Sequence, residues 1–97
     1  MKIVAVTACP TGIAHTYMAA EQLEKAAKRL GHVIKVETQG AMGIENELTA
    51  ADVNSADVAI IAADIALERP ERFDRIRKLE VPVQLAIKDP AAVFAKL

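Results

Sequence analysis

The sequence predicts an α/β fold, an open three-layer sandwich in which a four-stranded parallel sheet carries helices on both faces. Two observations predict it. Short apolar runs rich in valine and isoleucine alternate along the chain with segments of helical periodicity. The connections between these segments are short, as they are in compact α/β units.

The first strand and the first helix follow from local patterns. Ile3, Val4 and Val6 form a β-branched apolar run that predicts a buried strand. Residues 16–30 predict a helix, because apolar side chains recur there every three or four positions while Glu and Lys pairs occupy the other side. Gly31 then supplies a left-handed residue that ends the helix.

The next segments give a strand, a turn and a short helix. Residues 33–38 predict a second strand, and the glycine-containing segment 39–43 predicts a loop. Thr49 and Asp52 have the spacing of a capping box, which predicts a helix that ends near Ser55.

The C-terminal third predicts two further strands and two helices. Residues 58–62 form the third strand, and Pro70 fits the first turn of a helix. The expected inward-facing residues of that helix are Phe73, Ile76 and Leu79. Residues 82–87 predict the fourth strand, and Asp89 followed by Pro90 predicts an N-cap and a closing helix towards Leu97.

This order of elements predicts how the sheet is wound. Right-handed crossovers give the strand order 2-1-3-4 in a single Rossmann-like domain over residues 1–97. The winding then reverses between strands 1 and 3, and ligands of such sheets bind beside that point at the carboxyl ends of the strands. Cys9 follows strand 1 and is expected to lie there.

Composition narrows the function. The formal net charge of −1, from 12 basic and 13 acidic residues, gives no general attraction to nucleic acid or to anionic lipid. No apolar run approaches the roughly 18 residues of a membrane span, so we expect a cytoplasmic protein with no membrane insertion of its own. The single cysteine excludes an internal disulfide, and no spacing suggests a metal site.

The segment after the first strand is the candidate site. Cys9 is followed by the loop residues Pro10, Thr11, Gly12, Ile13, Ala14, His15 and Thr16. A helix start carries unpaired N–H groups and partial positive charge, so it is suited to hold phosphate and favours a thiolate. Cys9 is therefore a candidate nucleophile, with the loop as a phosphate cradle.

Three segments resemble one family. Residues 6–21 closely resemble the active-site segment of enzyme IIB domains of the fructose-type (fructose/mannitol superfamily) sugar phosphotransferase system. Residues 36–40 are similar to the second signature of that family, and residues 62–65 to its segment after the third strand.

The resemblance implies a phosphoryl carrier. Cys9 would accept phosphate from a phosphohistidine of enzyme IIA, hold it as phosphocysteine, and pass it to fructose or a related sugar taken up through the membrane transporter enzyme IIC. It implies no nucleotide, no metal and no other cofactor. The resemblance leaves open the sugar, a free-standing or a fused protein, and an association with the inner face of the membrane through IIC.

Alternatives to this function remain. Residues 86–90 lack the hydroxyl-containing turn common in the family, which fits a regulatory IIB-like domain without sugar transfer or another sugar. A cysteine-loop phosphatase has arginine where this chain has His15, and an FMN-binding flavodoxin-like domain needs more aromatic residues than the chain offers.

Other charged and polar residues have simpler interpretations. His15 fits equally a role in tuning Cys9 and a solvent-facing position, and His32 fits a helix end. The basic residues of one segment alternate with acidic ones and predict a solvated helix face; they are Arg69, Arg72, Arg75, Arg77 and Lys78.

Overall fold

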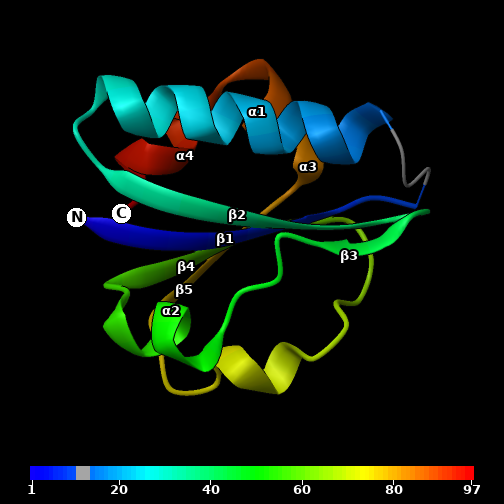
Figure 1. Cartoon of the computed structure of the whole chain (residues 1–97). Coiled ribbons are helices and arrows are strands. Elements are labelled where there is room, and N and C mark those ends of the chain that lie inside the picture. Colours follow the sequence, from blue (N-terminus) through cyan, green and yellow to red (C-terminus); the bar gives the residue numbers. More distant parts are fainter. Residues whose placement is uncertain (11–13) are drawn as a thin grey trace.

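The protein is a three-layer α/β sandwich with a mixed, five-stranded sheet at its centre (Figure 1). The structure, a computed structural model, describes residues 1–10 and 14–97. The strands are β1 (Lys2–Ala8), β2 (Val33–Gly40), β3 (Gly43–Glu45), β4 (Val58–Ala63) and β5 (Lys78–Val81). The helices are α1 (Ala14–Arg29), α2 (Ala50–Ser55), the 3-10 helix η1 (Pro70–Phe73), α3 (Val83–Lys88) and α4 (Pro90–Ala95).

Helices cover both faces of the sheet, as predicted. Helices α1, α3 and α4 lie over one face, and α2 and η1 lie against the other (Figure 1). The alternation of side chains along β1 divides the core accordingly. Ile3 and Ala5 point towards α1, whereas Val4 and Val6 point towards α2 and η1. None of the helices among residues 1–10 and 14–97 is long and apolar enough to cross a membrane.

The sheet order is β3-β2-β1-β4-β5, and β1 lies between β2 and β4. The prediction of a four-stranded, fully parallel sheet is wrong in one respect, because β3 adds a fifth strand antiparallel to β2. The glycine-containing loop of the prediction is the turn of this hairpin, and Gly43 has a φ of +87° there. A strand of three residues is too short to show an alternating pattern in the sequence.

The prediction of a strand over 82–87 is also wrong, because these residues lie within and beside α3. Pro82 precedes the helix, and Val83 and Ala86, three residues apart, are the two buried side chains of α3. The fourth parallel strand is β5, which pairs with β4 and ends one residue before Pro82.

The predicted helix after Pro70 is only the four-residue η1. Phe73 is buried as expected, but Ile76 packs in the cluster beneath the sheet while Leu79, already in β5, packs against the cluster on the α1 side. The two residues therefore serve opposite faces of the sheet and do not form one helical stripe.

The predicted helix caps are confirmed. The side chain of Thr49 accepts a hydrogen bond from the N–H of Asp52, and the Asp52 carboxylate accepts one from Thr49 N–H in return. Asp89 caps α4 through the N–H of Ala92. Gly31 has a φ of +78° and ends α1.

Candidate functional site

Cys9 directly follows strand β1 and lies at the carboxyl edge of the sheet. Ala8, the last residue of the strand, pairs with Gln39 of β2 on one side and with Ala63 of β4 on the other. Its carbonyl accepts a hydrogen bond of 3.1 Å from Asp64 N–H. The next residue, Cys9, is 6% exposed and packs in the core cluster on the α1 side. The Cys9 side chain therefore packs in the core at this edge of the sheet.

His15 lies beside the sulfur. Helix α1 begins at Ala14, and the Nδ1 atom of His15 lies 4.0 Å from Sγ of Cys9. The 16-residue helix directs the positive end of its dipole and its first N–H groups towards this edge. A helix start of this kind is suited to bind an anion such as phosphate.

Buried threonines line the floor of the site. Thr7 Oγ1 donates a hydrogen bond of 3.0 Å to the carbonyl of Thr16. Thr16 is itself fully buried, and no partner for its Oγ1 is found among the described residues. The same holds for Oγ1 of Thr38, which is the register partner of Thr7 in β2. Because unmade hydrogen bonds are costly in the interior, these hydroxyls are available to a group that enters the site.

Of the predicted loop, the structure describes Pro10 and residues 14–16. Pro10 and Ala14 are exposed, His15 is half-buried and Thr16 is buried. The predicted loop residues Thr11, Gly12 and Ile13 lie outside the described residues. Within the described part, no group of three His, Cys, Asp or Glu side chains could hold a metal ion.

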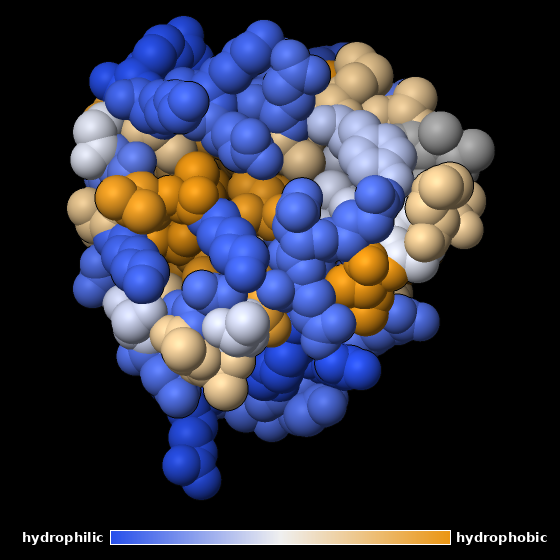
Figure 2. Space-filling model, in the orientation of Figure 1, coloured by the Kyte–Doolittle hydropathy of each residue, from blue (hydrophilic) through white to orange (hydrophobic). Residues whose placement is uncertain are grey.

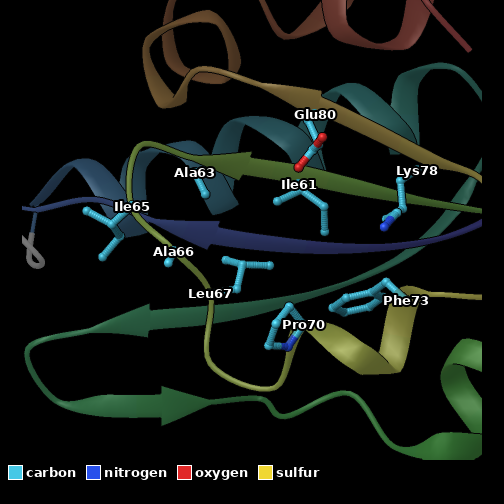
Figure 3. A pocket seen from close by; sticks show the side chains of 9 residues that line it. All are labelled: Ile61, Ala63, Ile65, Ala66, Leu67, Pro70, Phe73, Lys78 and Glu80. Atoms are coloured by element: carbon cyan, nitrogen blue, oxygen red, sulfur yellow. The ribbon is translucent and has the colours of Figure 1, made fainter.

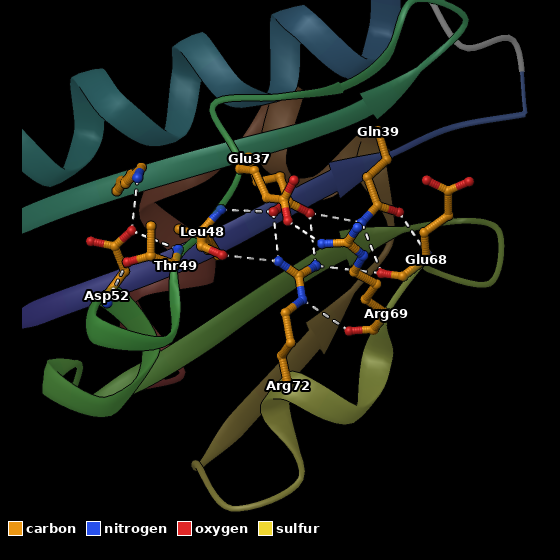
Figure 4. Close-up of polar contacts among 10 residues, drawn as sticks. Glu37, Gln39, Leu48, Thr49, Asp52, Glu68, Arg69 and Arg72 are labelled. Atoms are coloured by element: carbon orange, nitrogen blue, oxygen red, sulfur yellow. Dashed lines mark hydrogen bonds and ion pairs between the residues drawn. The ribbon is translucent and has the colours of Figure 1, made fainter.

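A buried ion pair lies beneath the same edge of the sheet, on the face opposite α1 (Figure 4). Glu37 of β2 is fully buried, and Arg72 of η1 donates two hydrogen bonds to its carboxylate, at 2.7 and 2.9 Å. Leu48 N–H donates to the same carboxylate at 2.8 Å. The guanidinium also lies 5.0 Å from the ring centre of Phe73.

The titration of the pair reflects these contacts. Burial raises the pKa of Glu37, but the hydrogen bonds from Arg72, Gln39 and Leu48 outweigh it, so the pKa lies below its ordinary value. The hydrogen bond to Glu37 raises the pKa of Arg72 in turn. Both side chains are therefore charged at neutral pH. The prediction that Arg72 belongs to a solvated helix face is wrong, because this residue reaches under the sheet.

Gln39 ties the segment after β4 to this pair (Figure 4). Its Nε2 atom donates to Glu37 at 2.8 Å, and its Oε1 atom accepts from Glu68 N–H at 2.8 Å. Nε2 also donates to the Glu68 carbonyl at 3.1 Å, and Arg72 Nε donates to the carbonyl of Arg69 at 3.0 Å. These bonds hold Arg69 at a φ of +54°, an unfavourable value for a residue other than glycine.

The sequence predicted a strand over residues 33–38 and a loop over 39–43, and residues 36–40 were also part of the resemblance, but this network was not predicted. A signal was present, because Glu37 and Gln39 are two positions apart and therefore share one face of the strand. Their partners, Glu68 and Arg72, come from a distant segment that the pattern alone does not identify.

Comparisons with known proteins decide the family. A family model described as "PTS system, Lactose/Cellobiose specific IIB subunit" matches residues 4–96. The chain is 54% identical over 96 residues to the "PTS system fructose-like EIIB component 2" of Escherichia coli (strain K12), an alignment that covers 99% of this chain and 91% of that relative. It belongs to the enzyme IIB family of the sugar phosphotransferase system.

In two further comparisons, the segment that matches this IIB protein belongs to a longer protein. The "PTS system 2-O-alpha-mannosyl-D-glycerate-specific EIIABC component" of Escherichia coli (strain K12) is 56% identical over 92 residues, which are 95% of this chain and 14% of that relative. The crystal structure of a domain from a fructose-specific IIABC component of Borrelia burgdorferi has a TM-score of 0.92 and 45% identity, covering 98% of this chain and 90% of that one. IIB components are phosphotransferases that carry phosphoryl groups in sugar uptake, and they work with IIA and IIC partners.

Proposed function

We propose that this IIB protein carries the phosphoryl group on Sγ of Cys9, taking it from a phosphohistidine of enzyme IIA and giving it to a sugar held by enzyme IIC. The observation that carries this assignment is the position of Cys9 at the carboxyl end of β1, beside His15 and the start of α1. Cys9 is also the single cysteine of the chain.

The two transfers balance without another reagent. In the first, the Cys9 thiolate attacks phosphorus, an S–P bond forms, and the P–N bond of the donor breaks with its electron pair going to the imidazole nitrogen. In the second, a sugar hydroxyl attacks phosphorus, an O–P bond forms, the S–P bond returns its electron pair to sulfur, and the hydroxyl proton leaves to a base. No nucleotide or metal is required, and we assign none.

The residues around Cys9 suit the charge that develops during transfer. The first N–H groups of α1 stabilise the equatorial oxygens of the phosphoryl group. The hydroxyl of Thr16, which is buried and available, donates a further hydrogen bond. His15, whose ring nitrogen lies 4.0 Å from the sulfur, orients the phosphoryl group. We also assign five loop residues to the phosphate cradle, because the loop resembles the active-site segment of the family. They are Pro10, Thr11, Gly12, Ile13 and Ala14.

The sugar we propose is fructose or a related one. The relative that matches over most of its own length is named fructose-like, and a relative of similar identity is named for 2-O-alpha-mannosyl-D-glycerate. Since the sugar is bound by IIC, we place the second transfer in the cytoplasm at the inner face of the membrane, where IIC presents its sugar.

Phosphate labelling tests the function. A phosphorylated IIA protein taken from an EIIABC relative is expected to label the wild-type protein, and Cys9→Ser is expected to abolish labelling without unfolding. Label that persists in Cys9→Ser would move the acceptor elsewhere and contradict the assignment. Adding IIC membranes with fructose, and in parallel with 2-O-alpha-mannosyl-D-glycerate, is expected to discharge the label to one of the sugars.

The same experiment separates the alternatives. A regulatory IIB-like domain would keep its label in the presence of IIC and every sugar. A cysteine-loop phosphatase would release inorganic phosphate without IIC, and an FMN-binding domain would be yellow after purification.

A further inference from the structure

Strand β5 forms one edge of the sheet, and its outer side is open. It is the last strand in the order β3-β2-β1-β4-β5 and pairs with β4. Within residues 1–10 and 14–97, no other strand pairs with it. An edge strand presents a row of backbone N–H and C=O groups to which a further strand can bond.

The ladder with β4 shows which backbone groups of β5 face outwards. Ala59 N–H of β4 donates a hydrogen bond of 2.9 Å to the carbonyl of Arg77. Alternate residues of a parallel strand bond to the same neighbour, so Leu79 also turns its N–H and carbonyl towards β4. The N–H and carbonyl groups of Lys78 and Glu80 therefore point to the open side.

The side chains of Lys78 and Glu80 lie on one face of β5 and carry opposite charges. Both line a groove of about 270 Å³ beneath β4 and β5, together with residues that include Ile61, Leu67 and Phe73 (Figure 3). Both are exposed, and in the described part of the chain neither side chain has a hydrogen-bond or ion-pair partner. The edge thus offers one unmatched cation and one unmatched anion.

The spacing of these charges makes β5 complementary to a second copy of itself. If two β5 strands run antiparallel with Leu79 opposite Leu79, then Lys78 of each copy lies opposite Glu80 of the other. The same register places the outward backbone groups of Lys78 and Glu80 against each other, as a hydrogen-bonded pair requires. A register shifted by two residues puts like charges opposite each other, so the charges select this one.

We propose that β5 is a self-association edge, through which two copies of this chain join antiparallel into one continuous sheet. Lys78 and Glu80 form two reciprocal ion pairs across the two-fold axis. Leu79 lies on the axis, and its side chain packs against the core cluster on the α1 side. This side chain is half-buried in one copy and is covered further by its counterpart in the pair.

The other edge of the sheet lacks this match. Strand β3 contains no basic residue, and its one charged side chain, Glu45, accepts a hydrogen bond from the Tyr17 hydroxyl. Figure 2 shows the face of the molecule that carries β2 and β3, where apolar and hydrophilic side chains are mixed. Self-complementary charges therefore distinguish β5 from β3.

Pairing through β5 leaves the Cys9 site open. Cys9 follows β1, which is separated from β5 by β4. Because the two β5 strands run in opposite directions, the carboxyl edges of the two sheets, and with them the two Cys9 side chains, face opposite ways. Each copy is therefore expected to accept phosphate as the monomer does, and the pairing does not depend on the proposed function.

Sedimentation equilibrium of the whole chain tests the pairing. A strand of four residues gives a small interface, so we expect a weak dimer with a Kd of about 100 µM. The measurement covers protein concentrations from about 10 µM to about 1 mM, at an ionic strength of about 0.05 M to limit the screening of the ion pairs.

Charge reversals test the register. Glu80→Lys and Lys78→Glu each place like charges opposite each other in both pairs, and each is expected to raise Kd about tenfold or more. The double variant, Lys78→Glu with Glu80→Lys, restores opposite charges and is expected to return to within about threefold of the wild type. The control is Glu24→Lys, exposed in the middle of α1, which should associate as the wild type does.

A mixture of the two single variants gives the sharpest result. The Glu80→Lys protein carries two cations at these positions and the Lys78→Glu protein two anions, so an equal mixture is expected to associate with about the wild-type Kd. A wild type that stays monomeric at about 1 mM overturns the proposal. A wild-type dimer that either single variant leaves intact, or a double variant as weak as the single ones, also overturns it. Loss of phosphate labelling would contradict only the proposed function.

Discussion

The carboxylate of Glu37 and the guanidinium of Arg72 form a two-pronged ion pair, 35 residues apart in sequence, in which the carboxylate is fully buried. Arg72→Met leaves that carboxylate without its cation, and we expect a loss of about 3–5 kcal/mol in the free energy of unfolding. Urea unfolding measures it. The double variant Glu37→Gln with Arg72→Met is expected to lose less than the two single variants together. Additive losses would show that the two groups do not depend on each other.

Acid is expected to destabilise the protein through carboxylates whose pKa is lowered on folding. The hydrogen bond from Lys35, followed by those from Thr49, lowers the pKa of Asp52 to about 2. A lowered folded-state pKa means that the unfolded chain binds protons first, so this stability is complete above pH about 4 and is lost as the pH falls towards 2. Urea unfolding between pH 7 and pH 2 should show a shallower decline for Asp52→Asn than for the wild type. Equal declines in the free energy of unfolding of the two proteins would contradict a lowered pKa for Asp52.

Gln39 is expected to control local opening of the segment after β4. In Gln39→Ala the N–H of Glu68 loses its acceptor, which lies 2.8 Å away. Amide hydrogen exchange at Glu68 should then accelerate by about tenfold or more, whereas the amide of Ala59, which is bonded to Arg77 across β4 and β5, should not change. Uniform acceleration at both amides would indicate global destabilisation and not local release.

Thr16 is expected to matter for transfer and not for folding. Thr16→Val keeps the shape of the side chain and removes a buried hydroxyl that has no partner among the described residues, so the free energy of unfolding should stay equal or rise. The transfer rate at saturating donor should fall about tenfold or more, because a donor to the phosphoryl oxygens is lost. Glu24→Lys, an exposed residue in the middle of α1, is the control and should leave the rate unchanged. A Thr16→Val protein with the wild-type rate would remove Thr16 from the cradle.

The sequence predicted best where one local pattern decides the structure. The β-branched runs of β1, β2 and β4, the capping box at Thr49 and the cap at Gly31 are all local, and they place Cys9 at the correct edge. The errors fall where long-range contacts decide. The residues of α3 are as apolar as a strand, and what starts a helix there is Pro82 together with the Asp64 carboxylate, which accepts a bond from Val83 N–H.

The same distinction applies to the site. Cys9 and His15 are six residues apart and were identified together, whereas Glu37 and Arg72 meet only through the fold. A charge buried under a sheet is not distinguishable, in the sequence, from one on the surface of a helix. The pairing of Arg72 with Glu37 could therefore be recognised only from the structure.

Phosphorus NMR of the wild-type protein, loaded by phosphorylated IIA, tests the central claim most directly. We expect one protein-bound resonance of the thiophosphate-ester type, discharged by iodine and absent from Cys9→Ser. A phosphoramidate resonance that is insensitive to iodine and disappears in His15→Asn would place the phosphoryl group on the neighbouring imidazole and contradict the account.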